Sequence, residues 1–143
     1  MANFIFYSDN LIKIAANEND KNSLPIAPIY TVKDVSDSDF LKVKKNSATA
    51  SLSGDNVVVT DYGSRGFEDE SQLQSYHENI ITQIDYFLNG TGNESKSLYD
   101  AITTYKTVLE GFDTSTITYP MTKTWEEYCE DNSIAYVSPL QIP

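Results

Sequence analysis

The chain has 143 residues, of which 21 are acidic and 10 basic, and its net charge is −11. Hydrophobic residues make up 40% and aromatic residues 12%, so the chain can bury a core and is not a disordered acidic tail. Its length suits a single domain. It has no apolar run of about 20 residues that could cross a bilayer, and no basic segment precedes the first apolar residues. We therefore expect a soluble, unexported protein with no membrane partner.

The negative charge is concentrated in the second half of the chain. Residues 1–62 hold eight acidic and six basic residues, a net charge of −2, whereas residues 63–143 hold thirteen and four, a net charge of −9. Nucleic-acid binding needs a basic stripe, and the one basic cluster consists of Lys42, Lys44 and Lys45. We interpret these lysines as the solvated end of a short helix and expect no nucleic-acid partner.

The first elements along the chain are predicted to be strands. Residues 4–7 and 11–15 are β-prone runs on either side of a polar turn, which predicts a hairpin. The first run is apolar on both faces and is therefore predicted to be covered on both sides. The polar residues 16–23 predict a loop, and residues 29–32 predict a third strand.

A short helix and a second hairpin follow. Ser36, with Asp39 three residues later, resembles a capping box and predicts a helix of two turns that ends near residues 44–46. Residues 48–53 and 56–61 flank a Gly-Asp turn and form the clearest hairpin signal in the chain.

At residues 62–66 the apolar pattern changes from a period of two to a period of 3.6, which predicts a boundary between strands and helices. Apolar residues form one stripe along residues 69–88 and another along 94–110. The glycine-containing link 89–93 predicts a left-handed helix stop and a tight connection. We therefore expect an antiparallel helix pair.

The last third of the chain is predicted to contain short elements. Residues 114–119 and 134–137 are candidate strands, and Thr124 opens a T-x-x-E capping box for a helix that ends at residue 131. Residues 139–143 form an apolar, proline-bounded tail that packs either on its own domain or along a neighbouring molecule. The sequence does not decide between the two.

Strands precede helices, which favours an α+β fold over an alternating α/β sheet. We expect one domain, 1–143, with a β-rich part at 1–62, a helix-rich part at 63–138 and the extended tail at 139–143. The antiparallel hairpins form a sheet, and the helix pair lies across one of its faces. The alternative, separate β and helical units, gives each unit a marginal core.

Cys129 and His77 are the only residues of their kinds, so no intrachain disulfide can form and any Cys/His catalysis must use both. The carboxylates around Cys129 disfavour the reactive thiolate. His77 falls within an apolar helical stripe and is predicted to be a core-edge histidine bonded to a neighbour. We therefore predict no catalytic residue and no enzymatic activity, although carboxylates that form no recognisable motif leave an enzyme as an alternative.

Metal and cofactor motifs are missing from the sequence. The chain has no zinc spacing, phosphate-binding loop or dinucleotide fingerprint. Asp34, Asp37 and Asp39 are weak calcium candidates, but their spacing differs from that of an EF-hand loop. Capping of the predicted helix by Ser36, with acids in its first turn, accounts for the same residues. We expect no cofactor.

Candidate interface residues come from the helices and the tail. The sequence contains ten tyrosines, and Tyr86 and Tyr99 point away from the apolar stripes of their helices. In the tail, Leu140 and Ile142 are the apolar residues that would contact a neighbour. These four residues are the predicted protein-protein interface.

Residues 35–45, with a D-x-D-F motif and a lysine-rich helix, and the hairpin 48–61 resemble small virion proteins of tailed bacteriophages, including the T4-like phages of marine cyanobacteria. The resemblance implies a non-catalytic component of a tail, baseplate, neck or capsid decoration. It implies assembly in the host cytoplasm and binding to other structural proteins or to copies of itself. The alternative from the charge is an acidic cytoplasmic inhibitor or regulator that mimics nucleic acid.

Overall fold

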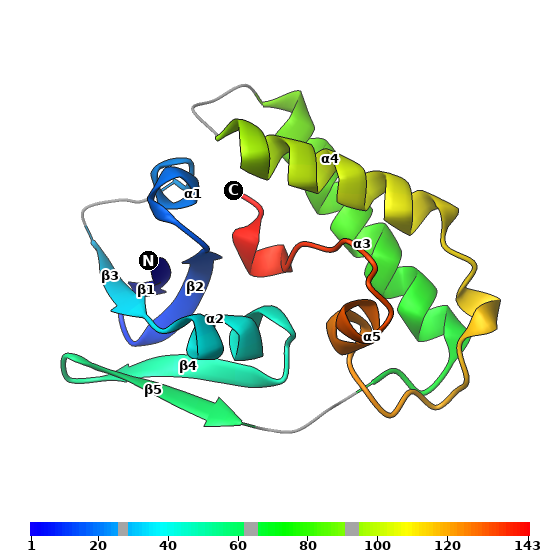
Figure 1. Ribbon diagram of the computed structural model, residues 1–143, viewed down its shortest axis with the longest axis horizontal. Coiled ribbons are helices and arrows are strands. Elements are labelled where there is room, and N and C mark those ends of the chain that lie inside the picture. The colour runs from blue at the N-terminus through cyan, green and yellow to red at the C-terminus, as the bar shows by residue number, and fades with distance from the viewer. Residues whose placement is uncertain (26–28, 62–65, 91–94) are drawn as a thin grey trace.

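The computed structural model describes residues 1–25, 29–61, 66–90 and 95–143. The strands lie in the N-terminal part of the chain and the long helices in the C-terminal part, side by side (Figure 1). The α+β class is therefore confirmed. Residues 62–65, which make up most of the expected boundary, and residues 91–93 of the expected helix connection lie outside the described residues.

Three strands form the first part of an antiparallel sheet: β1 (Ala2–Tyr7), β2 (Asn10–Ala15) and β3 (Tyr30–Val35). β1 is the central one and pairs with both neighbours, so that Phe4 lies opposite Ile14 on β2 and Lys33 on β3. The register between β1 and β2 shifts at Ile5 and Phe6, an irregularity of the kind that bends a sheet. The first hairpin and the third strand are thus confirmed.

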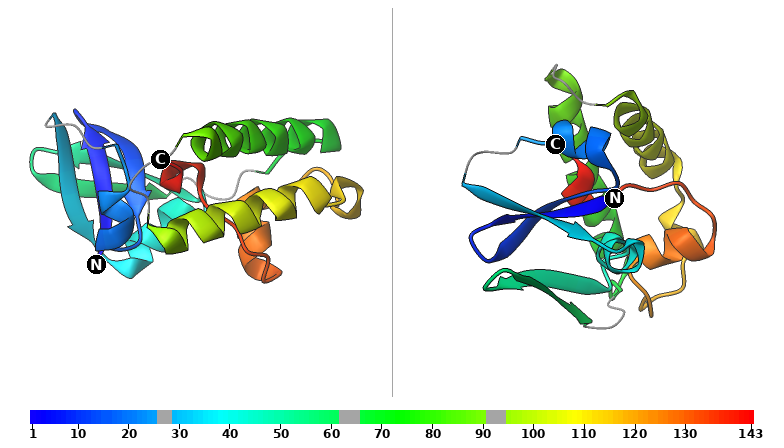
Figure 2. Two further views of the ribbon diagram at one scale, coloured as in Figure 1. Left: turned by 90° about the horizontal axis from the view of Figure 1, so that it is seen from above. Right: turned by 60° about the vertical axis from the view of Figure 1, so that its left-hand side comes forward.

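The second hairpin, β4 (Ala48–Ser53) and β5 (Asn56–Asp61), extends this sheet to the order β3-β1-β2-β4-β5. β4 meets β2 only where Asn10 pairs with Ser51, so the hairpin turns away from the first three strands and the sheet curls (Figure 2). Gly54 in the turn has φ +62°, a backbone conformation that favours glycine. The predicted hairpin is therefore confirmed with its turn chemistry.

β1 is buried on both faces, as its sequence predicts. Phe4 and Phe6 pack on one side with Val43 of α2 (Asp37–Lys44), whereas Ile5 packs on the other with Leu24. α2 begins as predicted, because Ser36 Oγ accepts a hydrogen bond of 3.1 Å from the Asp39 amide.

The expected loop 16–23 contains a helix, so that prediction is wrong. α1 (Glu18–Asn22) is capped by Asn17, whose side-chain oxygen accepts from the Asp20 amide at 2.9 Å. Leu24, which follows the helix, is buried against the second face of β1. The cap, the packing of Leu24 and a hydrogen bond of 2.8 Å from Ser95 Oγ to Asp20 Oδ1 hold a segment whose composition is otherwise typical of a loop.

The helical part is built on α3 (Glu70–Asn89) and α4 (Lys96–Gly111), which run in opposite directions (Figure 2). Both predicted helices are confirmed, and none of the described helices is both long and apolar enough to span a membrane. The predicted left-handed stop is wrong at Gly90, whose φ is −91°. The helical part also contains α5 (Trp125–Asp131), which starts with the predicted capping box at Thr124.

Neither predicted C-terminal strand forms within the described residues. In place of the first, residues Thr114–Thr116 form a 3-10 turn, η1, capped by Asp113, whose carboxylate accepts from the Ser115 amide at 3.0 Å. Residues 134–137 form no regular secondary structure and pair with no described strand. Both segments are β-prone, but they lie on the helical side of the molecule, beyond the sheet edges that could pair with them.

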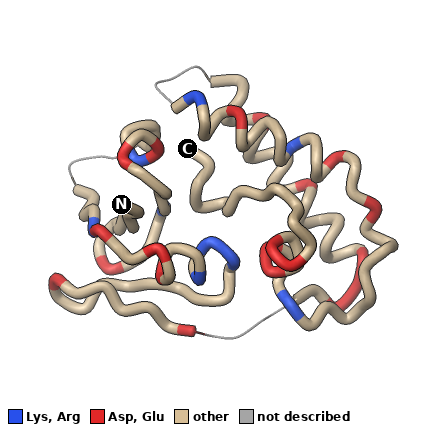
Figure 3. The backbone as a smooth tube through the Cα atoms, viewed as in Figure 1, with Lys and Arg blue, Asp and Glu red and all other residues tan. Residues whose placement is uncertain are grey.

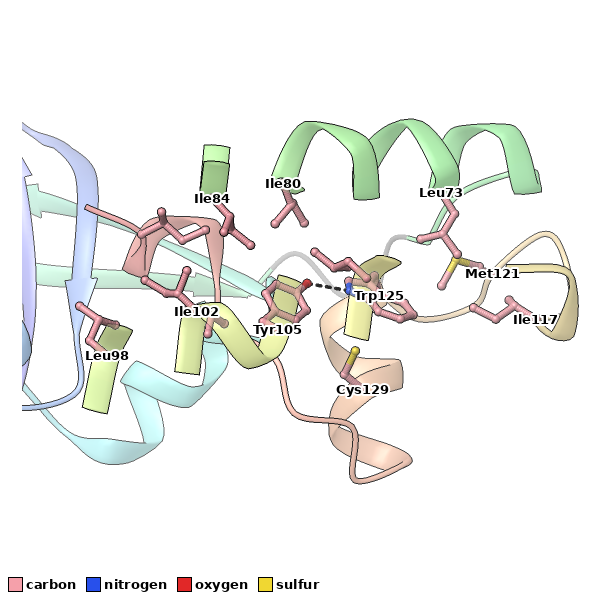
Figure 4. Packing of buried hydrophobic residues seen from close by; sticks show 13 residues of the cluster. Leu73, Ile80, Ile84, Leu98, Ile102, Tyr105, Ile117, Met121, Trp125 and Cys129 are labelled. Carbon is pink, nitrogen blue, oxygen red and sulfur yellow. Dashed lines mark hydrogen bonds between the residues drawn. The ribbon is translucent and has the colours of Figure 1, made fainter. Parts of the chain in front are cut away.

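The helix pair does not lie across a face of the sheet as expected. The largest hydrophobic cluster takes all its buried residues from position 73 onward, and Figure 4 shows it between α3, α4 and α5. The sheet has its own two clusters, which include no residue of α3 or α4. The curled sheet fills its interior with its own side chains and α2, so it needs no helix pair as a cover.

The C-terminal segment joins the two parts and packs on its own chain. It forms a 3-10 turn, η2 (Pro139–Gln141), from which Leu140 packs against the sheet cluster, while Ile142 is 0% exposed within the helical cluster. Lys13 Nζ donates to the Ile142 carbonyl at 2.6 Å, and Gln83 Nε2 donates to the Pro139 carbonyl at 3.0 Å. Both residues therefore make contacts within the chain. The prediction of Ile142 as an interface residue is wrong because it is buried, whereas Leu140 is half-buried and stays a prediction.

Candidate functional site

The candidate site is a group of buried polar and aromatic side chains around α5, here called the α5 cluster: Tyr76, His77, Tyr105, Trp125 and Glu126. They come from α3, α4 and α5. Hydrogen bonds and ring contacts join these side chains inside the helical part. Their arrangement decides whether this part of the chain can carry chemistry.

The start of α5 orients the cluster. Thr124 Oγ1 accepts from the Glu127 amide at 3.0 Å, and Glu127 Oε1 accepts from the Thr124 amide at 2.9 Å. Thr124 Oγ1 also donates to the Lys45 carbonyl at 2.6 Å, which fixes the first turn against the end of α2. The helix therefore turns Trp125 and Glu126 inward immediately after its cap.

Glu126 is a buried carboxyl, with 1% of its surface exposed. It accepts a hydrogen bond from the Tyr76 hydroxyl. Burial raises the pKa of the Glu126 carboxyl to about 7, even though the bond from Tyr76 favours the charged form. Burial, followed by the nearby Glu126 carboxyl, raises the pKa of the Tyr76 hydroxyl far above its usual range. Glu126 thus changes its charge near neutral pH.

Trp125 and Tyr105 form the buried centre of the cluster. The Trp125 Nε1–H group donates to the Tyr105 hydroxyl at 2.8 Å, the bond drawn in Figure 4. Trp125 is also stacked beside Tyr128, with ring centroids 5.8 Å apart. Because both hydrogen-bonding groups are buried, the bond satisfies polar atoms that water cannot reach.

His77 is 4% exposed and packs against aromatic rings. Its ring centroid lies 4.4 Å from that of Trp125 and 6.0 Å from that of Phe112. Burial lowers the pKa of the imidazole to about 4, so His77 is neutral at neutral pH. The core position is as predicted, but the bonded neighbour is not found, because Nε2 has no hydrogen-bond partner in the described structure.

The Cys/His pair does not form a catalytic arrangement. Cys129 is buried, and burial together with Glu126 and Glu130 raises the pKa of its thiol well above the usual range. No hydrogen bond joins Cys129 and His77 among the described residues. A buried, neutral thiol of this kind contributes packing.

Glu126 could take part in chemistry only if a substrate could reach its carboxyl. Tyr76 lines an open cavity of about 500 Å³, together with Ser71, Gln72 and Asn79 of α3. A carboxyl with a pKa near 7 suits proton transfer. Glu126, however, does not line this cavity, and its carboxylate is bonded to the Tyr76 hydroxyl. The geometry supports a buried titratable group that stabilises the helical core in its protonated form.

The calcium candidates do not come together. Asp34 lies on β3 and accepts from Asn3 Nδ2 at 2.5 Å, whereas Asp37 and Asp39 occupy the first turn of α2. Within the described ranges no three His, Cys, Asp or Glu side chains are grouped so as to hold a metal ion. The suggestion of a calcium site at these residues is therefore wrong, and capping by Ser36 explains the two helical acids.

The lysines at the end of α2 are not simply a solvated helix end, as the sequence suggested. Lys44 Nζ lies 4.7 Å from the centre of the Tyr136 ring, and the Tyr136 hydroxyl donates to Glu130 Oε2 at 2.9 Å. Burial lowers the pKa of Lys44, and the charge of Glu130 opposes that effect. The basic end of α2 thus faces the acidic α5 and helps to join the sheet to the helices (Figure 3).

The predicted interface tyrosines lie on the surface. Tyr86 is 86% exposed and Tyr99 is 39% exposed. Sequence reasoning missed a second exposed group, in which the Tyr7 and Tyr30 rings lie 5.7 Å apart at the end of the sheet beside the exposed Ile29. Both tyrosines were visible in the sequence at the ends of predicted strands, but their contact depends on the pairing of β1 with β3.

No protein-family model, curated protein or solved structure matches the chain at a significant level.

Proposed function

We propose that this chain is a non-enzymatic structural protein that binds neighbouring proteins in a larger assembly, as a virion component of a tailed bacteriophage. The resemblance of residues 35–45 and 48–61 to small virion proteins supports the phage assignment. The buried state of Glu126 and Cys129 supports a non-catalytic role. The tail, baseplate, neck and capsid decoration are the positions that the resemblance offers.

The observation that carries the proposal is the pair of open sheet edges. Within the described residues, β3 pairs only with β1, and β5 pairs only with β4. Each edge strand is six residues long, and Val58 in β5 is 42% exposed. Open edges of this kind can add a strand from a neighbouring chain through backbone hydrogen bonds.

The distribution of charge supports this proposal over mimicry of nucleic acid. Lysines of the same chain pair with Asp85 and Asp131, and with Asp100 at 3.3 Å. Glu126 is buried and does not contribute to the surface. The acidic helices therefore present less continuous charge than the sequence suggested, and a phosphate mimic needs a dense field.

Lysine substitutions on the two edges test the proposal. Thr31→Lys changes β3, Val58→Lys changes β5, and Thr49→Lys is the matched control at an exposed position of the inner strand β4. Charged edge residues oppose strand addition. We expect the amount of one or both edge variants in purified phage particles to be several-fold lower than that of the wild type, while the amount of the control is unchanged. Mass spectrometry of the particles measures these amounts. Circular dichroism verifies that each variant folds.

Two results would count against the proposal. One is that wild-type protein is missing from the particles and is a monomer in light scattering. The other is that it copurifies with a DNA-binding enzyme and salt releases it, which would favour the acidic inhibitor.

A further inference from the structure

A second cavity lies between the middle of α3 and the end of α4, and its lining includes His77 but not Glu126. Its volume is about 370 Å³, within the range of about 300 to 1,000 Å³ that is typical of ligand sites. Its polar lining consists of hydrogen-bond acceptors or neutral groups: Gln74, Glu78, Glu110 and Thr114. No lysine or arginine lines it among the described residues.

The acceptor atoms that line the cavity remain available for hydrogen bonds or ion pairs with a ligand. Gln74 Nε2 donates to Thr114 Oγ1 at 3.2 Å, which leaves the Gln74 carbonyl oxygen as an acceptor. Glu78 and Glu110 are exposed, and neither forms an ion pair within the described part of the chain. Glu110 also lies in the last turn of α4, which holds no basic residue to balance the negative end of the helix dipole.

An ion pair between the same two helices shows that the cavity lacks a cation beside its carboxylates. One turn before Glu110, Lys106 Nζ reaches across from α4 to Asp85 on α3, at 2.5 Å. At the cavity, Glu110 follows Lys106 by one turn of α4 and Glu78 precedes Asp85 by two turns of α3, and both side chains are carboxylates. A cation from outside the chain would pair with these carboxylates in the way that Lys106 pairs with Asp85.

The remaining wall is apolar and aromatic. Ile81, Leu109 and Phe112 line the cavity together with His77, which is 4% exposed and whose Nε2 has no hydrogen-bond partner. The imidazole is neutral at neutral pH, so it does not repel a positive charge. Apolar walls with acceptors at the rim suit a long side chain that has an apolar stem and a cationic head.

We infer that this cavity binds the arginine or lysine side chain of a neighbouring protein, with the head between Glu78 and Glu110 and the stem along Ile81 and Phe112. The inference rests on the proposed function, because it names a contact through which the chain binds its neighbours. The net charge of −11 favours a basic partner surface in the same sense.

The test is a titration of the full-length, isotope-labelled protein with N-acetyl-arginine methylamide, followed by amide chemical shifts. We expect saturable shifts centred on residues 74–81 and 109–114. The uncharged probe N-acetyl-norleucine methylamide should bind more weakly. The double variant Glu78→Gln, Glu110→Gln should weaken binding of the arginine probe about fivefold. The control Glu18→Gln, Glu68→Gln removes two charges outside the cavity and should leave binding unchanged.

Three results would overturn the inference: equal binding of the norleucine probe, shifts scattered over the acidic surface, or equal weakening in both double variants. The lysine analogue, run in parallel, decides which of the two cationic heads the site prefers. Failure here with normal incorporation into particles overturns the cavity alone. Localised arginine binding by a chain that stays out of particles would support the site and overturn the assembly role.

Discussion

Replacing Glu126 with glutamine should stabilise the protein at alkaline pH. The glutamine keeps the shape of the side chain and an oxygen that can accept from the Tyr76 hydroxyl, but it cannot ionise. In the folded chain, burial raises the pKa of Glu126 from an ordinary 4.5 to about 7. The folded state therefore holds the proton more tightly than the unfolded state between these two values.

The sign and size of the effect follow from this difference. Stability falls as pH rises wherever the folded state binds more protons, so the wild type loses stability from about pH 4.5 to about pH 7 through this group and then levels off. Each pH unit between the two pKa values corresponds to about 1.4 kcal/mol. Between pH 5 and pH 8.5 the wild type should lose about 2 to 3 kcal/mol relative to Glu126→Gln.

Urea unfolding of both proteins at pH 5 and pH 8.5, followed by the fluorescence of the single tryptophan, Trp125, measures the effect. The comparison cancels His77, whose lowered pKa acts in the opposite direction and equally in both proteins. The control Glu68→Gln, at an exposed position, should differ from the wild type by less than about 0.5 kcal/mol at both pH values. An equal gap between wild type and Glu126→Gln at both pH values would refute the reasoning, as would a wild type that gains stability on the alkaline side.

Three further substitutions test the packing. Tyr105→Phe leaves the buried Trp125 Nε1–H group without its acceptor and should cost about 1 to 3 kcal/mol in the free energy of unfolding. Ile142→Ala should cost about 2 to 5 kcal/mol in the same measurement, whereas Ile29→Ala, at an exposed position, should change stability by less than about 0.5 kcal/mol; equal costs would show that the tail is not part of the core. Thr124→Ala removes the helix cap and the bond to the α2 end, and thermal unfolding should show a loss of about 1 to 2 kcal/mol.

The hairpins and the long helices could be predicted because their signals are local. The Gly-Asp turn at 54–55 fixes its own hairpin, and the apolar stripe of α3 needs no knowledge of its partner. The capping box at Thr124 is likewise complete within four residues. These elements formed as expected because local propensity and tertiary packing agree.

The rest depended on contacts between distant parts of the chain. Residues 134–137 are β-prone, but they pair with no described strand, and Ile134 and Tyr136 pack against the helical cluster. The tail is part of the core because Ile142 packs in the helical cluster, and Lys13, 129 residues earlier, donates to the Ile142 carbonyl. The helix pair was expected to cover the sheet, yet the sheet curls and fills its own interior.

The candidate site was missed for a related reason. In the sequence, Glu126 is one acid in a run of carboxylates, which indicates a solvated helix. In the fold it is 1% exposed, and its carboxylate accepts a hydrogen bond from Tyr76, 50 residues earlier. The apolar character of its neighbours Trp125 and Cys129 was the only sequence signal that this turn of the helix faces inward.

The measurement that tests the assembly role most directly is quantitative mass spectrometry of particles purified from host cells in which the chain is produced. The proposal predicts that the chain is present in a constant ratio to the other structural proteins across the fractions of a density gradient. If the chain instead remains in the unassembled fraction as a free monomer while complete particles form without it, the proposed function is contradicted.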